Sequence, residues 1–331
     1  MKNSSLSRWL GRNSIVNALE VRVMPILRGT TVGINILGNG HCNLSCPSCP
    51  VGNFDFGKTK TMDLPLFKKI LDKVQREVKI RWVWISEYSE PLLHPKCHEF
   101  ISELTRRGLP SFISANLNYM PDMNPVLGAG LTGMRISLSG FTQEYYGYYH
   151  TGGNIDVVKR NMERLSETNK KYHVPVTVFF HRYRDNVHEM SPMREFAKTL
   201  GFDFDSCQAY YRPIEKALSY VTGVKIPQAD TELIERLAEP LLVRMGNANK
   251  IKSPCRSHYK QLEILSDGTI PACCHSTFDE NKLSVDGNKI KYLDWSIKDI
   301  RKIQRKMKIC DTCIAHGAHV LYNNNESVPD A

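Results

Sequence analysis

The chain has 331 residues, of which 41% are hydrophobic, and a formal net charge of +10. This length suits one large domain of about 200 residues with a smaller appendage, and the hydrophobic fraction is sufficient for a buried core. No apolar run reaches the roughly 18 residues that a membrane span requires. Arg8 and Arg12 interrupt the N-terminus, which excludes the apolar stretch of a signal peptide. We therefore expect a cytoplasmic protein that does not enter a membrane.

The ten cysteines are unevenly distributed along the chain. Eight of them fall in three clusters, at 42–49, 255–274 and 310–313, and only Cys97 and Cys207 stand alone. In a reducing compartment, clustered cysteines are metal ligands more often than disulfide partners. The pattern indicates metal sites and argues against a disulfide framework.

Two segments, 1–30 and 296–309, carry much of the positive charge. Such segments can bind nucleic acid or an anionic membrane. In 296–309, however, Ile297, Ile300 and Ile303 recur at helical spacing, so the basic residues occupy the opposite face of an amphipathic helix. We interpret this segment as a solvated helix face and do not expect nucleic-acid binding.

From residue 31 onward, short β-rich runs alternate with amphipathic helical patterns. The predicted strands are 31–36, 80–85, 111–115, 134–138, 176–180 and 202–204. The predicted helices between them are 62–78, 97–107, 154–172 and 187–200. This alternation predicts an α/β fold of parallel strands with right-handed crossovers, curved toward a partial barrel. We expect the active site at the carboxyl ends of the strands.

The alternation stops after residue 215. One further helix is predicted over 231–245, and the short, polar, cysteine-bearing segment that follows resembles a small metal-supported domain. The residues from Tyr322 onward are polar and are predicted to be disordered. The predicted organisation is an N-terminal extension at 1–30, a barrel at 31–215, a linker helix at 216–249, a cysteine-bearing domain at 250–316 and a tail at 317–331.

The first cysteine cluster has the spacing C-x3-C-x2-C and directly follows the first predicted strand. Thiolates are suited to iron–sulfur clusters and to zinc. Three local cysteines, Cys42, Cys46 and Cys49, would leave one iron of a cubane open to a small molecule. The alternative is a structural zinc site completed by a residue such as His41.

This loop and its place after the first strand resemble the radical S-adenosylmethionine (SAM) superfamily, whose fold is a partial (β/α)6 barrel. The resemblance implies that the three cysteines hold a 4Fe–4S cluster whose open iron binds the amino and carboxylate groups of SAM. It also implies that an electron from the cluster cleaves SAM into methionine and a 5′-deoxyadenosyl radical, which abstracts hydrogen from a substrate. An external electron donor of the flavodoxin or ferredoxin type would reduce the cluster.

Three later segments resemble motifs of the same superfamily. The sequence YSEPLLHP at 88–95 is similar to its glycine-glycine-glutamate-proline motif, which implies that Ser89 and Glu90 bind the methionine ammonium group. The strand ends SAN at 114–116 and SLSG at 137–140 resemble two further motifs. By the same resemblance, the candidate cofactor-binding residues in these segments are Ser114, Asn116 and Ser137.

The chain departs from the superfamily pattern at two points. Tyr88 and Ser89 stand where the family has two glycines. Ser48 precedes the third cysteine, where the family usually has an aromatic residue near the adenine of SAM. The adenine contacts are therefore less well indicated than the cluster ligands.

The second group of cysteines combines C-x12-G-x4-C with a later C-x2-C, around a predicted hairpin at 262–271. This spacing resembles the SPASM/twitch extension of many radical SAM enzymes. The resemblance implies one auxiliary 4Fe–4S cluster, because too few cysteines follow residue 255 for two. Its candidate ligands are Cys255, Cys273, Cys310 and Cys313. Cys274 could replace Cys273, and a structural zinc site remains the alternative.

Polar and aromatic residues gather at 145–150, 181–184 and 210–212, after later strands. They could line a pocket for a hydroxylated or anionic substrate, or they could be surface loops. Cys207 follows the last predicted strand and is a candidate hydrogen donor to a substrate radical. Its alternative role is that of a small buried hydrophobic residue.

Three functions are compatible with these patterns. The first is a radical SAM enzyme that dehydrogenates or epimerises a sugar, aminocyclitol or nucleoside-like metabolite. The second is a radical SAM maturase of a ribosomally made peptide, which is less favoured because no separate peptide-recognition domain is evident. The third is a basic, zinc-containing protein that binds nucleic acid. The sequence does not indicate the substrate, the reaction outcome or the oligomeric state.

Overall fold

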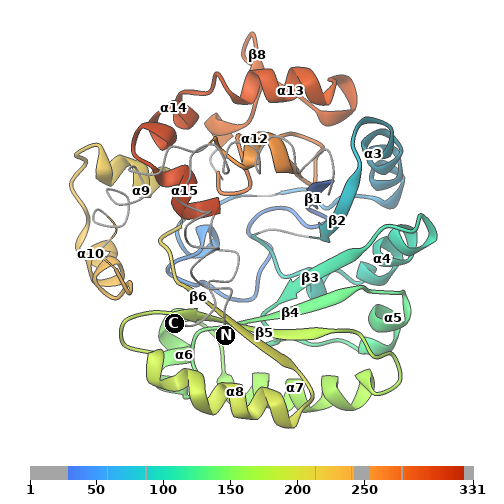
Figure 1. Cartoon of the computed structure of the whole chain (residues 1–331), viewed down its shortest axis with the longest axis vertical. Helices are drawn as coiled ribbons and strands as arrows, with labels where there is room; N and C mark the ends of the chain where they lie inside the picture. The colour runs from blue at the N-terminus through green and yellow to red at the C-terminus, as the bar shows by residue number, and fades with distance from the viewer. Residues whose placement is uncertain are drawn as a thin grey trace, which may run out of the picture.

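The structure is a computed structural model that describes residues 29–57, 59–85, 88–212, 214–239, 241, 254–276 and 279–323. Its centre is a curved, parallel, seven-stranded sheet with the strand order β6-β5-β4-β3-β2-β1-β7 (Figure 1). The strands are β1 (Thr30–Ile34), β2 (Ile80–Ile85), β3 (Ser111–Ala115), β4 (Gly133–Leu138), β5 (Val176–Arg182), β6 (Asp203–Gln208) and β7 (Gln261–Ile264). The predicted α/β fold with a partial barrel is confirmed.

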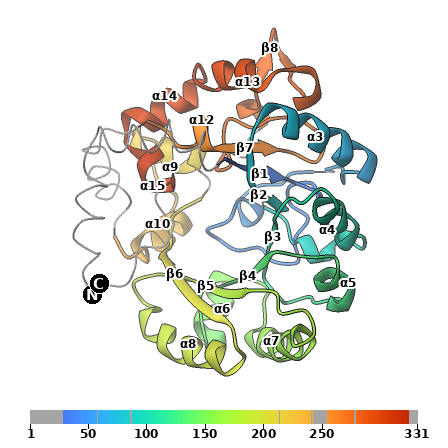
Figure 2. The ribbon, with the colours of Figure 1, turned by 45° about the vertical axis from the view of Figure 1, so that its right-hand side comes forward.

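Helices pack against the convex side of the sheet (Figures 1 and 2). They are α3 (Leu64–Glu77), α4 (Cys97–Arg106), α5 (Met123–Gly128), α7 (Ile155–Asn169) and α8 (Met190–Thr199). In α3, the carboxylate of Asp63 caps the first turn by accepting a hydrogen bond from the Leu66 amide at 2.7 Å. The stripe that includes Phe67 and Leu71 is fully buried against the sheet. Local capping and hydrophobic periodicity therefore produce the predicted helix.

The sequence predicted these long helices but not the short ones. The segment predicted as one helix at 187–200 is a 3-10 turn, η3 (Val187–Glu189), followed by α8. Two short helices, α5 of the set above and α6 (Gln143–Tyr149), were not predicted. Each has at most two turns, which is too short to show a clear hydrophobic period.

Strand β7 is the main difference from the prediction of six strands. Residues 261–264 pair in parallel with β1, with Thr31 opposite Gln261 and Ile34 opposite Ile264 (Figure 2). The predicted turn is present, since the Gly268 amide donates to the Leu265 carbonyl at 2.8 Å. The strand before this turn joins the barrel sheet, which gives β1 a partner on an edge that would otherwise expose its backbone.

Gly33 on β1 leaves room for the side chain of Glu263 on β7. A Cβ at this position would lie 1.8 Å from the Glu263 carboxylate. Any side chain at residue 33 would therefore displace the end of the Glu263 side chain, which is buried.

The C-terminal part of the chain lies against one end of the sheet (Figure 1). Its elements are α9 (Ile214–Val221), α10 (Gln228–Glu235), α12 (Ser257–Lys260), β8 (Ser284–Val285), β9 (Asn288–Lys289), α13 (Ile297–Gln304), α14 (Lys308–Ala315) and α15 (Ala318–Asn323). The helix predicted at 231–245 is only partly correct: α10 begins three residues earlier and ends at Glu235, and residues 236–239 are not helical. Residues 240 and 242–253 lie outside the described part of the chain. Disorder was predicted from Tyr322 onward, but the first two residues of that segment belong to the end of α15. Burial of the apolar side chains earlier in α15 stabilises this helix. Residues 324–331 lie outside the described part of the chain.

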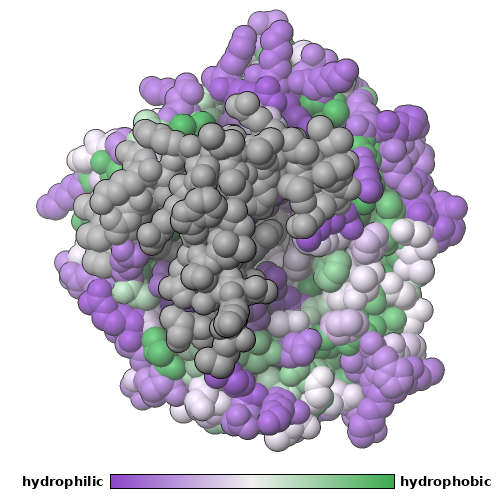
Figure 3. All heavy atoms as spheres, in the orientation of Figure 1, coloured by the Kyte–Doolittle hydropathy of each residue, from purple (hydrophilic) through white to green (hydrophobic). Residues whose placement is uncertain are grey.

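The basic segment at 296–309 has the predicted amphipathic character. In α13, Ile297 and Ile300 are buried, and Ile303 packs against the same core. Hydrophilic side chains occupy the rim of the face shown in Figure 3, including the region over α13. Of the other basic segment, 1–30, residues 1–28 lie outside the described residues. Within the described ranges, none of the helices combines the length and the apolar character needed to cross a membrane.

Candidate functional site

The carboxyl ends of the strands surround a cavity of about 230 Å³. Its lining includes all three cysteines of the first cluster together with four of the five candidate cofactor-binding residues. These residues are Cys42, Cys46, Cys49, Ser89, Ser114, Asn116 and Ser137. The structure thus brings together side chains from the β1 loop and from the ends of β2, β3 and β4.

The cysteine loop is fixed by hydrogen bonds to its own backbone. Asn53 donates from its side-chain amide to the carbonyls of Pro47 and Cys49, each at 2.7 Å. Burial is the main cause that raises the pKa of Cys42, to about 11, and burial also raises the pKa of Cys46. Without a metal these thiols stay protonated at neutral pH, and a bound metal would favour their deprotonation.

Glu90 takes a different position from the other candidate residues. Its carboxylate accepts hydrogen bonds from the Asn116 amide at 2.7 Å and from the Leu92 amide at 3.2 Å, and the residue is 2% exposed. It does not belong to the described lining of the cavity. Burial raises its pKa to about 7. Glu90 therefore lies behind the cavity wall and holds the β2 and β3 loops together.

Asn116 connects Glu90 to the cysteine loop. Its side-chain amide lies 3.7 Å from the sulfur of Cys42 and donates to the Asn43 side chain at 3.0 Å. The candidate residues of β3 and the first cysteine are thus in direct contact.

The cavity is also lined by two histidines, which the sequence motifs did not identify individually. His150 lies with Nδ1 3.7 Å from the Cys46 sulfur and Nε2 3.1 Å from the Ser139 hydroxyl. His181, near the end of β5, also lines the cavity. Burial lowers the pKa of His150 to about 3 and of His181 to about 4, so both rings are neutral at pH 7. The only sequence signal for them was their place in the polar segments 145–150 and 181–184.

Cys207 lies on β6 next to His181, which is its partner in the sheet register. It is 2% exposed and does not belong to the described lining of the cavity. The two strands are parallel and in register, so its side chain is on the same side of the sheet as His181.

The second group of cysteines lines a separate small cavity, of about 20 Å³. The four cysteines proposed from the spacing all contribute: Cys255, Cys273, Cys310 and Cys313. His258 lines the same cavity, with Nε2 3.5 Å from the Cys310 sulfur. The thiol of Cys274 donates instead to the Gln261 side chain at 3.1 Å. Of the two adjacent cysteines, the structure therefore favours Cys273 as a member of this group.

Solved structures share this fold. Streptococcus suis SuiB bound to S-adenosylmethionine matches with a TM-score of 0.57 and 13% identity, over 86% of this chain and 68% of that one. The protein anSMEcpe with bound AdoMet matches with a TM-score of 0.53 and 15% identity, over 85% of this chain and 82% of that one. This chain has the radical SAM fold.

The sequence comparisons are more limited. A Pyrococcus furiosus protein described as a tungsten-containing aldehyde ferredoxin oxidoreductase cofactor-modifying protein is 30% identical over 82 residues. The match spans 25% of this chain and 23% of that protein. No protein-family model matches the chain.

The thiols of both cysteine groups are donors that suit an iron–sulfur cluster or zinc, and the two kinds of site arrange their ligands differently. In the described ranges, no three Cys, His, Asp or Glu side chains are grouped as a site for one ion. A zinc ion requires its thiolates to converge to about 2.3 Å from a single point. A cubane binds each cysteine through a different iron, so its ligands surround a volume instead.

Two elements of this radical SAM fold connect the cysteine groups. On α9, Glu215 accepts a hydrogen bond from Ser276 at 2.8 Å, and the neighbouring Lys216 donates to Asn53 of the first loop at 2.9 Å. Tyr88 donates from its hydroxyl to the Cys274 carbonyl at 2.8 Å. Its φ of +50° lies in the left-handed region, which is costly for a bulky residue. Glycine, the residue that the resemblance leads one to expect at this position, adopts this region without strain.

Proposed function

We propose that this protein is a radical SAM enzyme in which Cys42, Cys46 and Cys49 hold a 4Fe–4S cluster. The observation that carries the proposal is the shared cavity, in which three thiols meet polar side chains from three neighbouring strand ends. When bound and reduced, the cluster supplies the electron that cleaves SAM to methionine and a 5′-deoxyadenosyl radical. The three cysteines would leave one iron available for the cofactor, since no fourth cysteine is among the described lining residues of this cavity.

The chain's own residues would bind and orient SAM. We assign Ser89, Ser114 and Asn116 to the amino-acid end of the cofactor, because all three line the cavity and the Asn116 side chain lies 3.7 Å from the Cys42 sulfur. Ser137 on β4 is assigned to the carboxylate or the ribose. Glu90, when ionised, would favour the ammonium group from behind the wall and also fixes the Asn116 backbone.

A second 4Fe–4S cluster is proposed at Cys255, Cys273, Cys310 and Cys313. Its support is their common cavity and the burial that raises the pKa of Cys310 to about 12, since thiols of this kind become thiolates when they bind metal. This assignment makes 250–316 a SPASM/twitch-like region whose strand β7 joins the 31–215 barrel. An external flavodoxin or ferredoxin is the proposed electron donor.

The proposed substrate is a polar metabolite, such as a sugar, aminocyclitol or nucleoside-like compound, that is dehydrogenated or epimerised. Its support is the part of the cavity lined by His181, Tyr210 and Arg212, which offers hydrogen-bonding groups to hydroxyls or to an anionic group. Cys207 beside His181 is the proposed hydrogen donor in an epimerisation.

A peptide substrate is the second candidate. Two solved structures with this fold contain a peptide: SuiB bound to precursor peptide SuiA, and anSMEcpe with bound AdoMet and Cp18Cys peptide. Both likenesses are at 13% identity.

The test is anaerobic reconstitution, reduction and incubation with SAM. We expect about eight irons per chain and release of 5′-deoxyadenosine. The triple variant C42A/C46A/C49A is expected to keep about four irons and to release none. A fully loaded protein that releases no 5′-deoxyadenosine would refute the catalytic proposal. A colourless protein with about two zinc ions would support the nucleic-acid-binding alternative.

The second site has a matched pair of variants in that triple-variant background. We expect Cys273→Ser to lose the remaining iron and Cys274→Ser to keep it, because only the first sulfur lines the cavity. Equal iron content in the two variants would contradict the assignment.

A further inference from the structure

The ring of His150, just after α6, connects the sulfur of a proposed cluster ligand to a buried hydroxyl. Its Nδ1 lies 3.7 Å from the Cys46 sulfur, and its Nε2 lies 3.1 Å from the hydroxyl of Ser139, which follows β4. All three residues line the first cavity. His150 is 6% exposed and Ser139 is 3% exposed. Bulk water therefore competes little with either contact, and a hydrogen bond in such surroundings is stronger than one in solvent.

Both the ring and the backbone of His150 are held against the cysteine loop. The ring stacks on Tyr146 with ring centroids 4.7 Å apart and an interplanar angle of 13°. The His150 amide donates to the Tyr146 carbonyl at 2.8 Å. The next residue, Thr151, accepts a hydrogen bond at its carbonyl from the Ser45 amide at 2.9 Å. This backbone contact joins the turn after α6 to the loop that carries Cys46, so the distance between ring and sulfur is fixed from both sides.

The direction of both hydrogen bonds follows from the state of Cys46 in a metal site. A cysteine that ligates iron is a thiolate, which accepts hydrogen bonds and cannot donate one. The contact at Nδ1 then requires the proton to be on this nitrogen, which leaves Nε2 of a neutral ring as an acceptor. The hydroxyl of Ser139 can donate to Nε2. Two hydrogen bonds in series therefore run from Ser139 through His150 to the Cys46 sulfur.

We infer that His150, with its tautomer fixed by Ser139, donates a hydrogen bond to the Cys46 sulfur and raises the reduction potential of the proposed SAM-cleaving cluster. Reduction adds one electron from the external donor and increases the negative charge on the sulfur ligands. An N–H donor therefore stabilises the reduced form more than the oxidised form, and hydrogen bonds to the sulfurs are among the factors that set such potentials. The inference rests on the proposed function, since it presumes a cluster at the first cysteine group.

The test is a redox titration of the reconstituted, full-length protein, in which electron paramagnetic resonance follows the reduced clusters. The signal that remains in C42A/C46A/C49A belongs to the second site and is subtracted. His150→Phe keeps a ring that can stack on Tyr146 but has no N–H group. We expect its ratio of reduced to oxidised cluster at a given potential to fall about tenfold. This change corresponds to a midpoint about 59 mV more negative than that of the wild type.

Two further variants separate the hydrogen bond from the shape of the ring. In His150→Asn, the amide nitrogen is as many bonds from the backbone as Nδ1 is, so the variant keeps a donor for the Cys46 sulfur without a ring. We expect its midpoint to lie close to that of the wild type. Ser139→Ala keeps the ring but removes the hydroxyl that fixes the tautomer. Its midpoint should shift in the same direction as that of His150→Phe, by a smaller amount.

The matched control is His181→Phe, which replaces the other histidine of the cavity lining. Its Nδ1 lies 3.2 Å from the Leu138 carbonyl, so its ring is engaged with the backbone of β4. This variant should keep the wild-type midpoint. A shift as large as that of His150→Phe would mean that the general polarity of the cavity sets the potential, and would overturn the inference.

Two other results would also contradict it. The first is a wild-type midpoint in His150→Phe. The second is a midpoint in His150→Asn as negative as that in His150→Phe, which would mean that only the shape of the ring matters. Where His150→Phe loses iron, Ser139→Ala decides, and a wild-type midpoint in that variant rejects the inference. The proposed function fails in a different way, because the wild type would then hold no more iron than C42A/C46A/C49A.

Discussion

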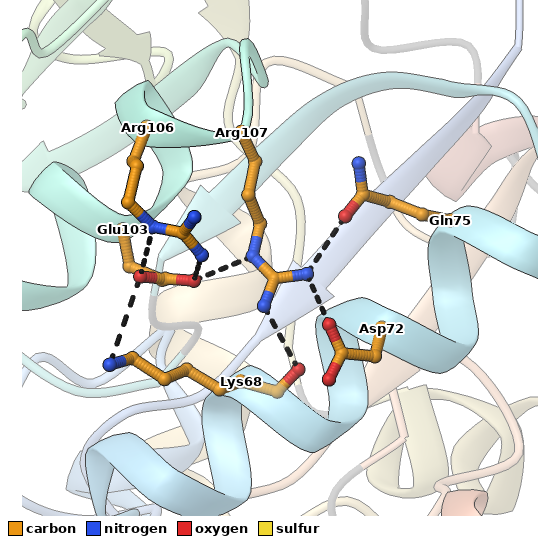
Figure 4. Close-up of polar contacts among 6 residues, drawn as sticks. All are labelled: Lys68, Asp72, Gln75, Glu103, Arg106 and Arg107. Atoms are coloured by element: carbon orange, nitrogen blue, oxygen red, sulfur yellow. Dashed lines mark hydrogen bonds and ion pairs between the residues drawn. The ribbon is translucent and has the colours of Figure 1, made fainter.

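A cluster of charges between α3 and α4 gives the most quantitative prediction. The carboxylate of Glu103 accepts hydrogen bonds from Arg106 at 2.6 and 3.0 Å and from Arg107 at 2.6 Å (Figure 4). Arg107 also pairs with Asp72 of α3 at 2.6 Å and donates to Gln75 at 2.9 Å. The Glu103 side chain is 6% exposed. Replacing it with glutamine removes the charge at the centre of this contact.

The size of the effect follows from the pKa of Glu103. Hydrogen bonding from Arg106 is the main cause that lowers this pKa from 4.5 to about 2. Such a change corresponds to roughly 3 kcal/mol of stability at neutral pH. The Arg106 side chain is 66% exposed, so solvent screening reduces our expectation for Glu103→Gln to about 2 kcal/mol.

The loss of stability expected for Glu103→Gln depends on pH. A carboxyl with a lowered pKa contributes stability that is complete above the unfolded-state pKa and is lost as the pH falls toward the folded-state pKa. The difference in unfolding free energy between wild type and Glu103→Gln should therefore be largest above pH 5 and shrink between about pH 4.5 and 2.

Urea unfolding of the metal-free chain at several pH values measures this difference without the acid release of iron. The matched control is Glu99→Gln on the same helix, where the pair with Lys96 is 3.3 Å long and largely exposed. We expect this control to change stability by less than about 0.5 kcal/mol. A Glu103→Gln effect that is independent of pH, or no larger than that of the control, would refute the reasoning.

Two further predictions concern strand fit and cofactor binding. Gly33→Ala should destabilise the protein by about 1–3 kcal/mol, because its Cβ would lie 1.8 Å from the Glu263 carboxylate. In urea unfolding, the double variant G33A/E263A should recover most of this loss, and a double variant as unstable as G33A alone would contradict the account. Burial raises the pKa of Glu90 to about 7, so SAM affinity should rise about tenfold from pH 6 to pH 8 as the carboxyl ionises. Equilibrium dialysis of Glu90→Gln should show no rise in SAM affinity between pH 6 and pH 8. If the variant shows the same rise as the wild type, Glu90 is not its cause.

The sequence alone determined the features that depend on local spacing. The alternation of short apolar runs with helical stripes predicted six strands of the sheet and the helices α3, α4, α7 and α8, because each pattern is complete within one element. The spacing of Cys42, Cys46 and Cys49 likewise predicted a ligand set within a single loop. These predictions required no knowledge of which elements become neighbours.

Only the tertiary structure decided which distant residues meet. Strand β7 joins β1 across more than 200 residues, and its four residues show no period that would assign them to the barrel. His150 reaches Cys46, and Cys273 rather than Cys274 lines the cavity of the other cysteines. Such contacts depend on sheet order and on the direction of each side chain. Neither is encoded in local hydrophobic periodicity. The sequence therefore predicted which residues could carry the chemistry of the site, but not which side chains line its cavity.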